Sequence, residues 1–197
     1  MITLFEKYID DYDYNIADKM YYYYNYNKKY NFQYTKEEIM NYIDNADDLD
    51  IFSEKTVKHI PALIYCINRN DLEMVEYLLK AGATLNIQSN LTMFPFPLFI
   101  AVTNEFIDMI KLFIKYKIKP NYRNNMKQTA LLINVRTKNN KEINDLLLPI
   151  TNWYYKDFDG NDIFNYLSID YANEIKQKYK NKYYEYKKGK TKNKFNL

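Results

Sequence analysis

The strongest constraint on this chain is a repeat of 33 to 35 residues in its apolar side chains. Three segments carry apolar residues at the spacing of one helical face, so each predicts a short amphipathic helix. Such a helix cannot cover its own apolar face, which favours stacking on neighbouring copies. The matching residues are Val75, Leu78 and Leu79, then Ile110, Phe113 and Ile114, then Ile143, Leu146 and Leu147.

A second series, upstream of the first within each repeat, keeps the same step. Leu63, Leu98, Leu131 and Phe164 stand 35, 33 and 33 residues apart. Two helices per repeat, joined by a short turn, are therefore predicted, with small residues such as Cys66 and Ala101 where helices approach closely.

Four segments bring this pattern close to a known family. They are "EMVEYLLKAGATLN" (73–86), "FPLFIAV" (96–102), "QTALLINV" (128–135) and "DFDGNDIF" (157–164). Together they resemble the ankyrin repeat, with Asp157 and Gly160 at its D-x-x-G positions and Gly82 at its helix-ending glycine, which Lys117 and Ile150 replace in later repeats. The resemblance implies an all-α ankyrin-repeat solenoid of about four stacked helix-turn-helix repeats, including degenerate ends.

The expected organisation follows from the extent of the repeats. Residues 1–34 are assigned to a helical N-terminal cap, because no first helix is recognisable before the degenerate copy "EEIMNYIDNADDLDI". The array occupies residues 35–175, and a basic tail, expected to be disordered from Lys187 onward, occupies residues 176–197. The individual repeats are placed near 35–55, 56–90, 91–124, 125–157 and 158–175.

The residues that support catalysis or metal binding are scarce. There is one histidine, His59, and one cysteine, Cys66, which reads as a buried packing residue. Asp162 is interpreted as a helix N-cap and the acids before it as turn residues rather than a calcium loop. We therefore predict no enzyme activity, no catalytic residue, no metal site and no cofactor.

Composition adds expectations about compartment and source. The sequence has neither a signal peptide nor an apolar stretch of about 18 residues, so no membrane span is expected. An intracellular, cytoplasmic monomer is predicted, with the nucleus as the alternative. The abundance of residues with AT-rich codons, including 23 tyrosines, resembles the divergent ankyrin proteins of large AT-rich DNA viruses, which implies a host protein as partner.

The resemblance also implies where a partner protein would bind. Ankyrin proteins use the loop tips and the exposed side of each first helix, which form a preformed concave surface. Trp153, in contrast, is expected to pack between the last repeats. The predicted partner-binding residues are Tyr65, Arg69, Gln88, Met93, Asn104, Tyr122, Arg123, Asn125, Met126, Arg136, Tyr155 and Phe158.

An alternative function rests on the basic tail. Residues 176–197 contain nine lysines and one acid, with Tyr183, Tyr184 and Tyr186 placed among them. Nucleic acid or an anionic surface could bind there through charge, with bases stacking on the tyrosines. The leading prediction remains a scaffold or adaptor that binds another protein.

Overall fold

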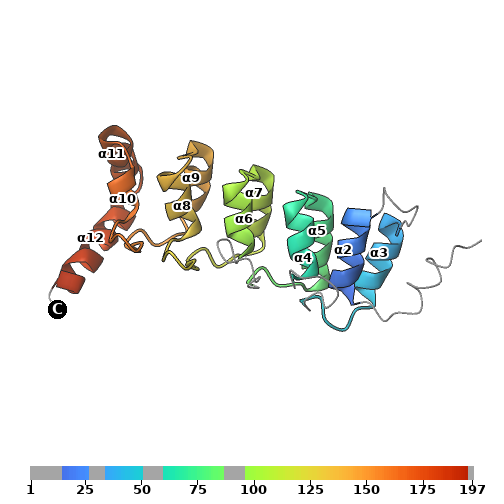
Figure 1. The fold of residues 1–197 in the computed structure, drawn as a ribbon. Coiled ribbons are helices and arrows are strands. Elements are labelled where there is room, and N and C mark those ends of the chain that lie inside the picture. The colour runs from blue at the N-terminus through green and yellow to red at the C-terminus, as the bar shows by residue number, and fades with distance from the viewer. Residues whose placement is uncertain (1–14, 27–33, 51–59, 87–95, 195–197) are drawn as a thin grey trace, which may run out of the picture. The chain divides into compact units, whose positions relative to one another are not determined.

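The computed structural model describes residues 15–26, 34–50, 60–86 and 96–194, and every regular element in these ranges is a helix (Figure 1). The chain forms two compact units whose boundary falls within residues 91–98. The prediction of an all-α fold built from short stacked helices is confirmed within these ranges.

The first unit contains two helix pairs: α2 (Ile16–Tyr26) with α3 (Lys36–Asp44), and α4 (Ala62–Asn68) with α5 (Leu72–Ala81). Helix α2 packs against α4, and α3 packs against α5. Between α2 and α4, the sulfur atoms of Met20 and Cys66 lie 4.0 Å apart, and both residues are fully buried. The hydroxyl of Tyr24 on α2 donates to Asp71, the N-cap residue of α5, at 2.8 Å.

Helix α2 falls within residues 1–34, which were assigned to a helical cap. It packs against α4, as a first helix packs against the first helix of the next repeat. The contacting residues Met20 and Cys66 are 46 positions apart in the chain. Such an offset is larger than the period of the other repeats, and a search at a fixed period therefore missed the helix.

The second unit repeats the pairing through α6 (Pro97–Thr103) and α7 (Ile107–Lys115), α8 (Ala130–Arg136) and α9 (Lys141–Leu147), and α10 (Ile163–Tyr166) and α11 (Ile169–Lys178). Helix α9 packs against α7 and α8, and α8 packs against α10 (Figure 1). Ile110, Phe113 and Ile143 are fully buried, as is Val75 in the first unit. The predicted apolar faces are thus the packing faces.

Polar side chains define where the helices begin. Asp71, Thr129, Asn140 and Ser168 each accept a backbone N–H from the first turn of the helix that follows. Asp162 does the same for α10, which confirms its predicted role as an N-cap. These bonds satisfy N–H groups that have no partner within the helix.

The turn that ends the second helix of a repeat forms with glycine in one repeat and with lysine in the next. Gly82 closes α5 with a φ of 113°, and Lys117 takes the same left-handed region after α7 with a φ of 57°. The bond from the N–H of Ala83 to Leu78 recurs as that from Ile118 to Phe113. Ile150 does not adopt a positive φ, so the third helix end differs in its turn.

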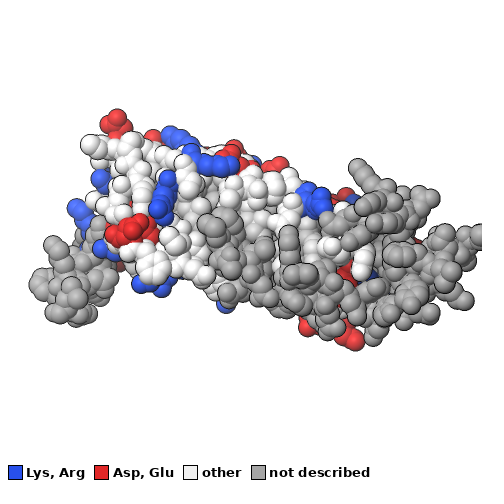
Figure 2. All heavy atoms as spheres, viewed as in Figure 1, with Lys and Arg blue, Asp and Glu red and all other residues white. Residues whose placement is uncertain are grey.

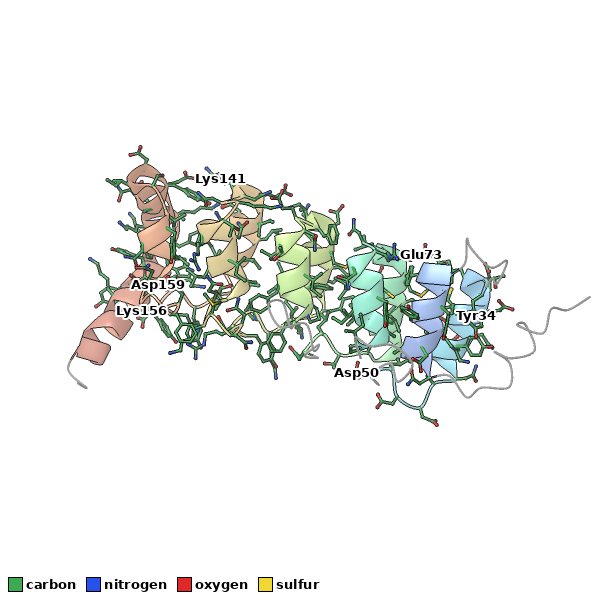
Figure 3. The ribbon with its side chains drawn as sticks, in the orientation of Figure 1. Tyr34, Asp50, Glu73, Lys141, Lys156 and Asp159 are labelled. Carbon is green, nitrogen blue, oxygen red and sulfur yellow. The ribbon has the colours of Figure 1, made fainter. Side chains whose placement is uncertain are left out.

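Side-chain acceptors also connect the segment after one second helix with the next repeat. In the first unit, the Asp50 carboxylate accepts the N–H of Thr84 at 2.9 Å (Figure 3). In the second unit, the amide oxygen of Asn121 accepts the N–H of Asn152 at 2.8 Å. Burial raises the pKa of the Asp50 carboxyl above its usual value, although the bond from Thr84 opposes this shift.

Ion pairs bridge successive second helices on the exposed side of the second unit. Figure 2 shows positive and negative side chains intermixed along the edge that α7, α9 and α11 occupy in Figure 1. The pairs are Lys111 with Glu142 at 3.1 Å, Lys141 with Glu174 at 2.9 Å, and Lys178 with Asp145 at 3.0 Å.

The C-terminal helix α12 (Lys180–Lys194) covers the aromatic end of the last repeat. The rings of Tyr183 and Tyr186 lie 5.6 and 5.0 Å from that of Phe164, and the Tyr186 hydroxyl donates to the buried Asp162 carboxylate at 2.9 Å. Trp153, only 1% exposed, contacts Phe164 with ring centroids 5.8 Å apart, which confirms its predicted packing role.

This helix extends to Lys194, whereas disorder was expected from Lys187 onward. Tyr183 and Tyr186, which precede Lys187, pack against Phe164. The same packing removes most of the predicted base-stacking platform: Tyr186 is buried and Tyr183 half-buried, and only Tyr184 is exposed.

Candidate functional site

Two successive turns in the second unit have the same hydrogen-bond geometry. In the first turn, the side-chain oxygen of Asn124 accepts the N–H groups of Met126 and Gln128 at 3.0 and 2.9 Å. In the second, Asp157 accepts those of Asp159 and Asn161, both at 3.0 Å. An asparagine therefore replaces the expected aspartate without changing the turn, because only one acceptor oxygen is used.

Each turn also needs one residue with a left-handed backbone. Gly160 supplies it in the second turn with a φ of 80°, and Lys127 supplies it in the first with a φ of 58°. The backbone bonds then match: Lys127 donates to Asn124 at 2.9 Å, and Gly160 donates to Asp157 at 3.1 Å. The turns are held by their own main chain, so they are rigid platforms for the side chains between these positions.

A backbone bond joins the two turns to each other. The N–H of Phe158 donates to the carbonyl of Met126 at 3.2 Å. Both side chains point outward, and Met126 is 45% exposed and Phe158 61% exposed. Large apolar groups that are exposed together are typical of an interaction site.

Cations from one repeat lie over aromatic rings of the next. The Arg123 guanidinium lies 5.1 Å from the ring centre of Tyr155, and the Lys127 ammonium lies 4.8 Å from that of Phe158. Within the described residues, neither Arg123 nor Lys127 forms an ion pair with a carboxylate. Their positive charges are positioned by neutral rings, which add no negative charge.

We call this region the tip surface. Lys156 and Asp159 lie at the end of the helices opposite to that of Lys141 (Figure 3). Arg136 lies at its edge, 4.0 Å from the Asp159 carboxylate and 5.8 Å from the ring centre of Tyr166. The tip surface consists of Arg123, Met126, Lys127, Tyr154, Tyr155, Lys156, Phe158 and Asp159.

A buried carboxylate anchors the second turn from below. Asp157 is 5% exposed and accepts a hydrogen bond from the Tyr166 hydroxyl. Burial alone would raise the pKa of the Asp157 carboxyl, but the Tyr166 hydroxyl and the N–H groups of Asn161 and Asp159 donate to it and lower that pKa below its usual value. The folded state therefore favours the ionised form of this aspartate.

Four of the predicted binding residues lie in this region. Arg123, Met126, Tyr155 and Phe158 belong to the tip surface. Arg69, Asn104, Asn125 and Arg136 are exposed, and Tyr122 is half-buried. Gln88 and Met93 lie outside the described residues, as does His59.

One predicted contact residue is misplaced. Tyr65 was expected on the exposed side of a first helix, but it is only 7% exposed, and the ring of Tyr21 on α2 lies 5.8 Å from it. The unrecognised helix α2 covers the position. Tyr65 is therefore a packing residue in the first unit.

Sequence reasoning also overlooked residues that the tip surface uses. Lys127 is not among the predicted contact residues, although it stands 33 residues before Gly160 and shares its left-handed backbone. Tyr166 was missed although it follows Ile133 by 33 residues, so the repeat period alone would have placed it beside the second turn.

Of the two residues considered for chemistry, His59 and Cys66, the structure describes Cys66. Cys66 is fully buried as predicted, and burial raises the pKa of its thiol to about 12. Such a thiol stays protonated at neutral pH and is a poor nucleophile. The described cysteine and acidic residues form no group that could hold a metal ion. No described helix is long and apolar enough to cross a membrane.

The stacked helix pairs and the recurring turns define a helical repeat protein. A family model for ankyrin repeats in three copies matches residues 63–162, about half of the chain, and the chain belongs to this family. Among solved structures, the ankyrin repeat domain of Bcl-3, described as a member of the IkappaB protein family, is similar with a TM-score of 0.50 and 20% identity. That match covers 57% of this chain and 46% of the other, and it shows that the two share a fold. A comparison with curated proteins found no match.

Proposed function

We propose that this chain binds a partner protein through the tip surface and performs no chemistry of its own. Ankyrin repeats are general protein-interaction modules, and family membership supports the class of function. The observation that carries the proposal is the backbone bond between the two turns, which holds Met126 and Phe158 side by side and exposed. Little ordering entropy is lost when such a preformed surface binds.

The proposal extends to the setting of the complex. The chain acts as a monomer inside the cell, in the cytoplasm or alternatively the nucleus. Its composition and degenerate repeats support an origin in a large AT-rich DNA virus, with a host protein as the partner. The lysine-rich tail is not proposed as a nucleic-acid site, because its Tyr183 and Tyr186 pack against the last repeat.

A site-specific photo-crosslinker tests the proposal directly. We expect a crosslinker at position 158 to capture a discrete partner in the native cell, and one at position 169 to capture none. Ile169 is the matched control, because it is 80% exposed and lies on α11, outside the tip surface. Equal capture at both positions, or capture that survives Met126→Ala with Tyr154→Ala, would contradict the assignment of the site.

A further inference from the structure

The tip surface combines charge with apolar side chains in a way that restricts its partner. Arg123, Lys127 and Lys156 carry positive charge on it, and Asp159 is the exposed carboxylate among its residues. A partner must therefore offset a net positive charge while covering two exposed apolar groups. The charge and the apolar groups of the tip surface therefore restrict the class of partner more than the fold alone does.

The position of Arg123 over the Tyr155 ring fixes where its charge is presented. A guanidinium carries five N–H donors, and the neutral ring offers no carboxylate to bind them. Such a group suits two-point binding of a carboxylate. The ring also lowers the entropy that a mobile arginine would lose on binding, since the side chain is already positioned.

The apolar part of the surface lies next to Lys127. Met126 and Phe158 come from successive turns, and Lys127 lies over Phe158 with its ammonium 4.8 Å from the ring centre. An apolar side chain that covers Met126 and Phe158 therefore has cations close on the same surface. Carboxylates beside that side chain would meet those cations.

A protein segment fits these features better than a nucleic acid does. Arg123 and Lys127 already occupy one face of the Tyr155 and Phe158 rings, which limits base stacking. The Asp159 side chain is 64% exposed and would repel a phosphate backbone that passes the second turn. An aliphatic side chain such as Met126 adds apolar contact that phosphates cannot use.

We propose that the tip surface binds an acidic segment of its partner, in which carboxylates flank a large apolar side chain. The apolar side chain covers Met126 and Phe158, and the carboxylates pair with Arg123 and Lys127. This inference rests on the proposed function and specifies its partner. It predicts binding that weakens as ionic strength rises, because exposed charges are screened by salt.

Selection from a random linear peptide display library on the immobilised full chain tests the inference. We expect the enriched peptides to be net negative and to contain at least one large apolar residue. Their affinity should fall at least about ten-fold for the double variant Arg123→Glu with Lys127→Glu, because the charges now repel. The control variant Lys180→Glu with Lys188→Glu makes the same change in charge on exposed residues of α12 and should leave affinity unchanged.

The outcomes separate this inference from the proposed function. Enriched peptides that are neutral or basic, yet lose affinity with Phe158→Ala, would overturn the acidic chemistry and keep the site. Peptides that bind every tip-surface variant equally would overturn the site itself. Failure to enrich any peptide, or displacement of the selected peptides by a single-stranded oligonucleotide, would also count against the acidic segment.

Discussion

At the scale of single residues, the same turn is built from different side chains. Asn124 and Asp157 hold equivalent turns through one oxygen atom each, and Lys127 and Gly160 provide the left-handed residue. Asp50 and Asn121 show a similar exchange after the second helices, since each accepts a backbone N–H of the next repeat. Carboxylates at these positions differ from amides mainly in their response to pH.

Replacement of Asp157 by asparagine should destabilise the protein at neutral pH. The variant keeps an acceptor oxygen for the turn but loses the charge that the Tyr166 hydroxyl stabilises, at a cost of about 1 kcal/mol. Because the folded state lowers the pKa of Asp157, its stabilisation is present above the unfolded pKa of about 3.9 and is lost as pH falls through the folded value. Urea unfolding from pH 7 downward should show the deficit shrinking below about pH 4, and a constant deficit would refute the ionised anchor.

Replacement of Asp50 by asparagine should stabilise the protein at neutral pH, in contrast to the same replacement at Asp157. Burial raises the pKa of this carboxyl, so its charged form costs stability at neutral pH. Asn121 shows that an amide oxygen can accept the equivalent bond. The variant should be more stable than the parent at pH 7, and the gain should vanish as pH falls through the folded pKa toward about 4. A loss of stability at pH 7 in urea titrations would show that the charge is needed.

At the scale of helices, a helix could be placed from the sequence where its residues follow the repeat period. Val75, Ile110 and Ile143 follow the period, and all three are fully buried as expected. Helix α2 escaped because Met20 is 46 residues from its contact Cys66, which breaks the period. Half of the tip surface was predictable by counting repeats, whereas the cation–ring contacts depend on side-chain directions that no spacing reveals.

Helix α12 should be held to the last repeat by Tyr186. Removing its hydroxyl in Tyr186→Phe takes one donor from the fully buried Asp162 carboxylate, which should cost about 1–2 kcal/mol of unfolding free energy. Trp153 is buried close to this contact, so its fluorescence reports the loss. The control Tyr184→Phe alters a side chain that is 60% exposed and should change stability little. Equal effects from the two variants would mean that α12 is not anchored through Tyr186.

At the scale of the whole molecule, stability comes from contacts between neighbouring repeats. Lys141 and Glu174 illustrate this, since they lie 33 residues apart and bridge α9 and α11 at 2.9 Å. Both side chains are exposed, so solvent weakens the attraction. The buried apolar faces therefore supply most of the stacking energy, and the ion pairs act mainly on register.

Charge reversal tests whether the ion pair between Lys141 and Glu174 contributes through charge rather than packing. Lys141→Glu and Glu174→Lys should each lower stability slightly, and the double variant should recover part of the loss, because the pair is restored in reverse. The recovered part, obtained from a double-mutant cycle, should shrink as sodium chloride screens the charges. A coupling that is independent of salt would indicate that packing, rather than charge, links these two side chains.

The exchange of Asn124 for Asp157 and of Lys127 for Gly160 has an evolutionary consequence. Each turn requires one acceptor oxygen and one left-handed residue, and Met126 in the first turn and Phe158 with Asp159 in the second supply neither. Mutations there can accumulate without loss of the scaffold. A lineage of such chains can consequently change its partner rapidly while its architecture persists.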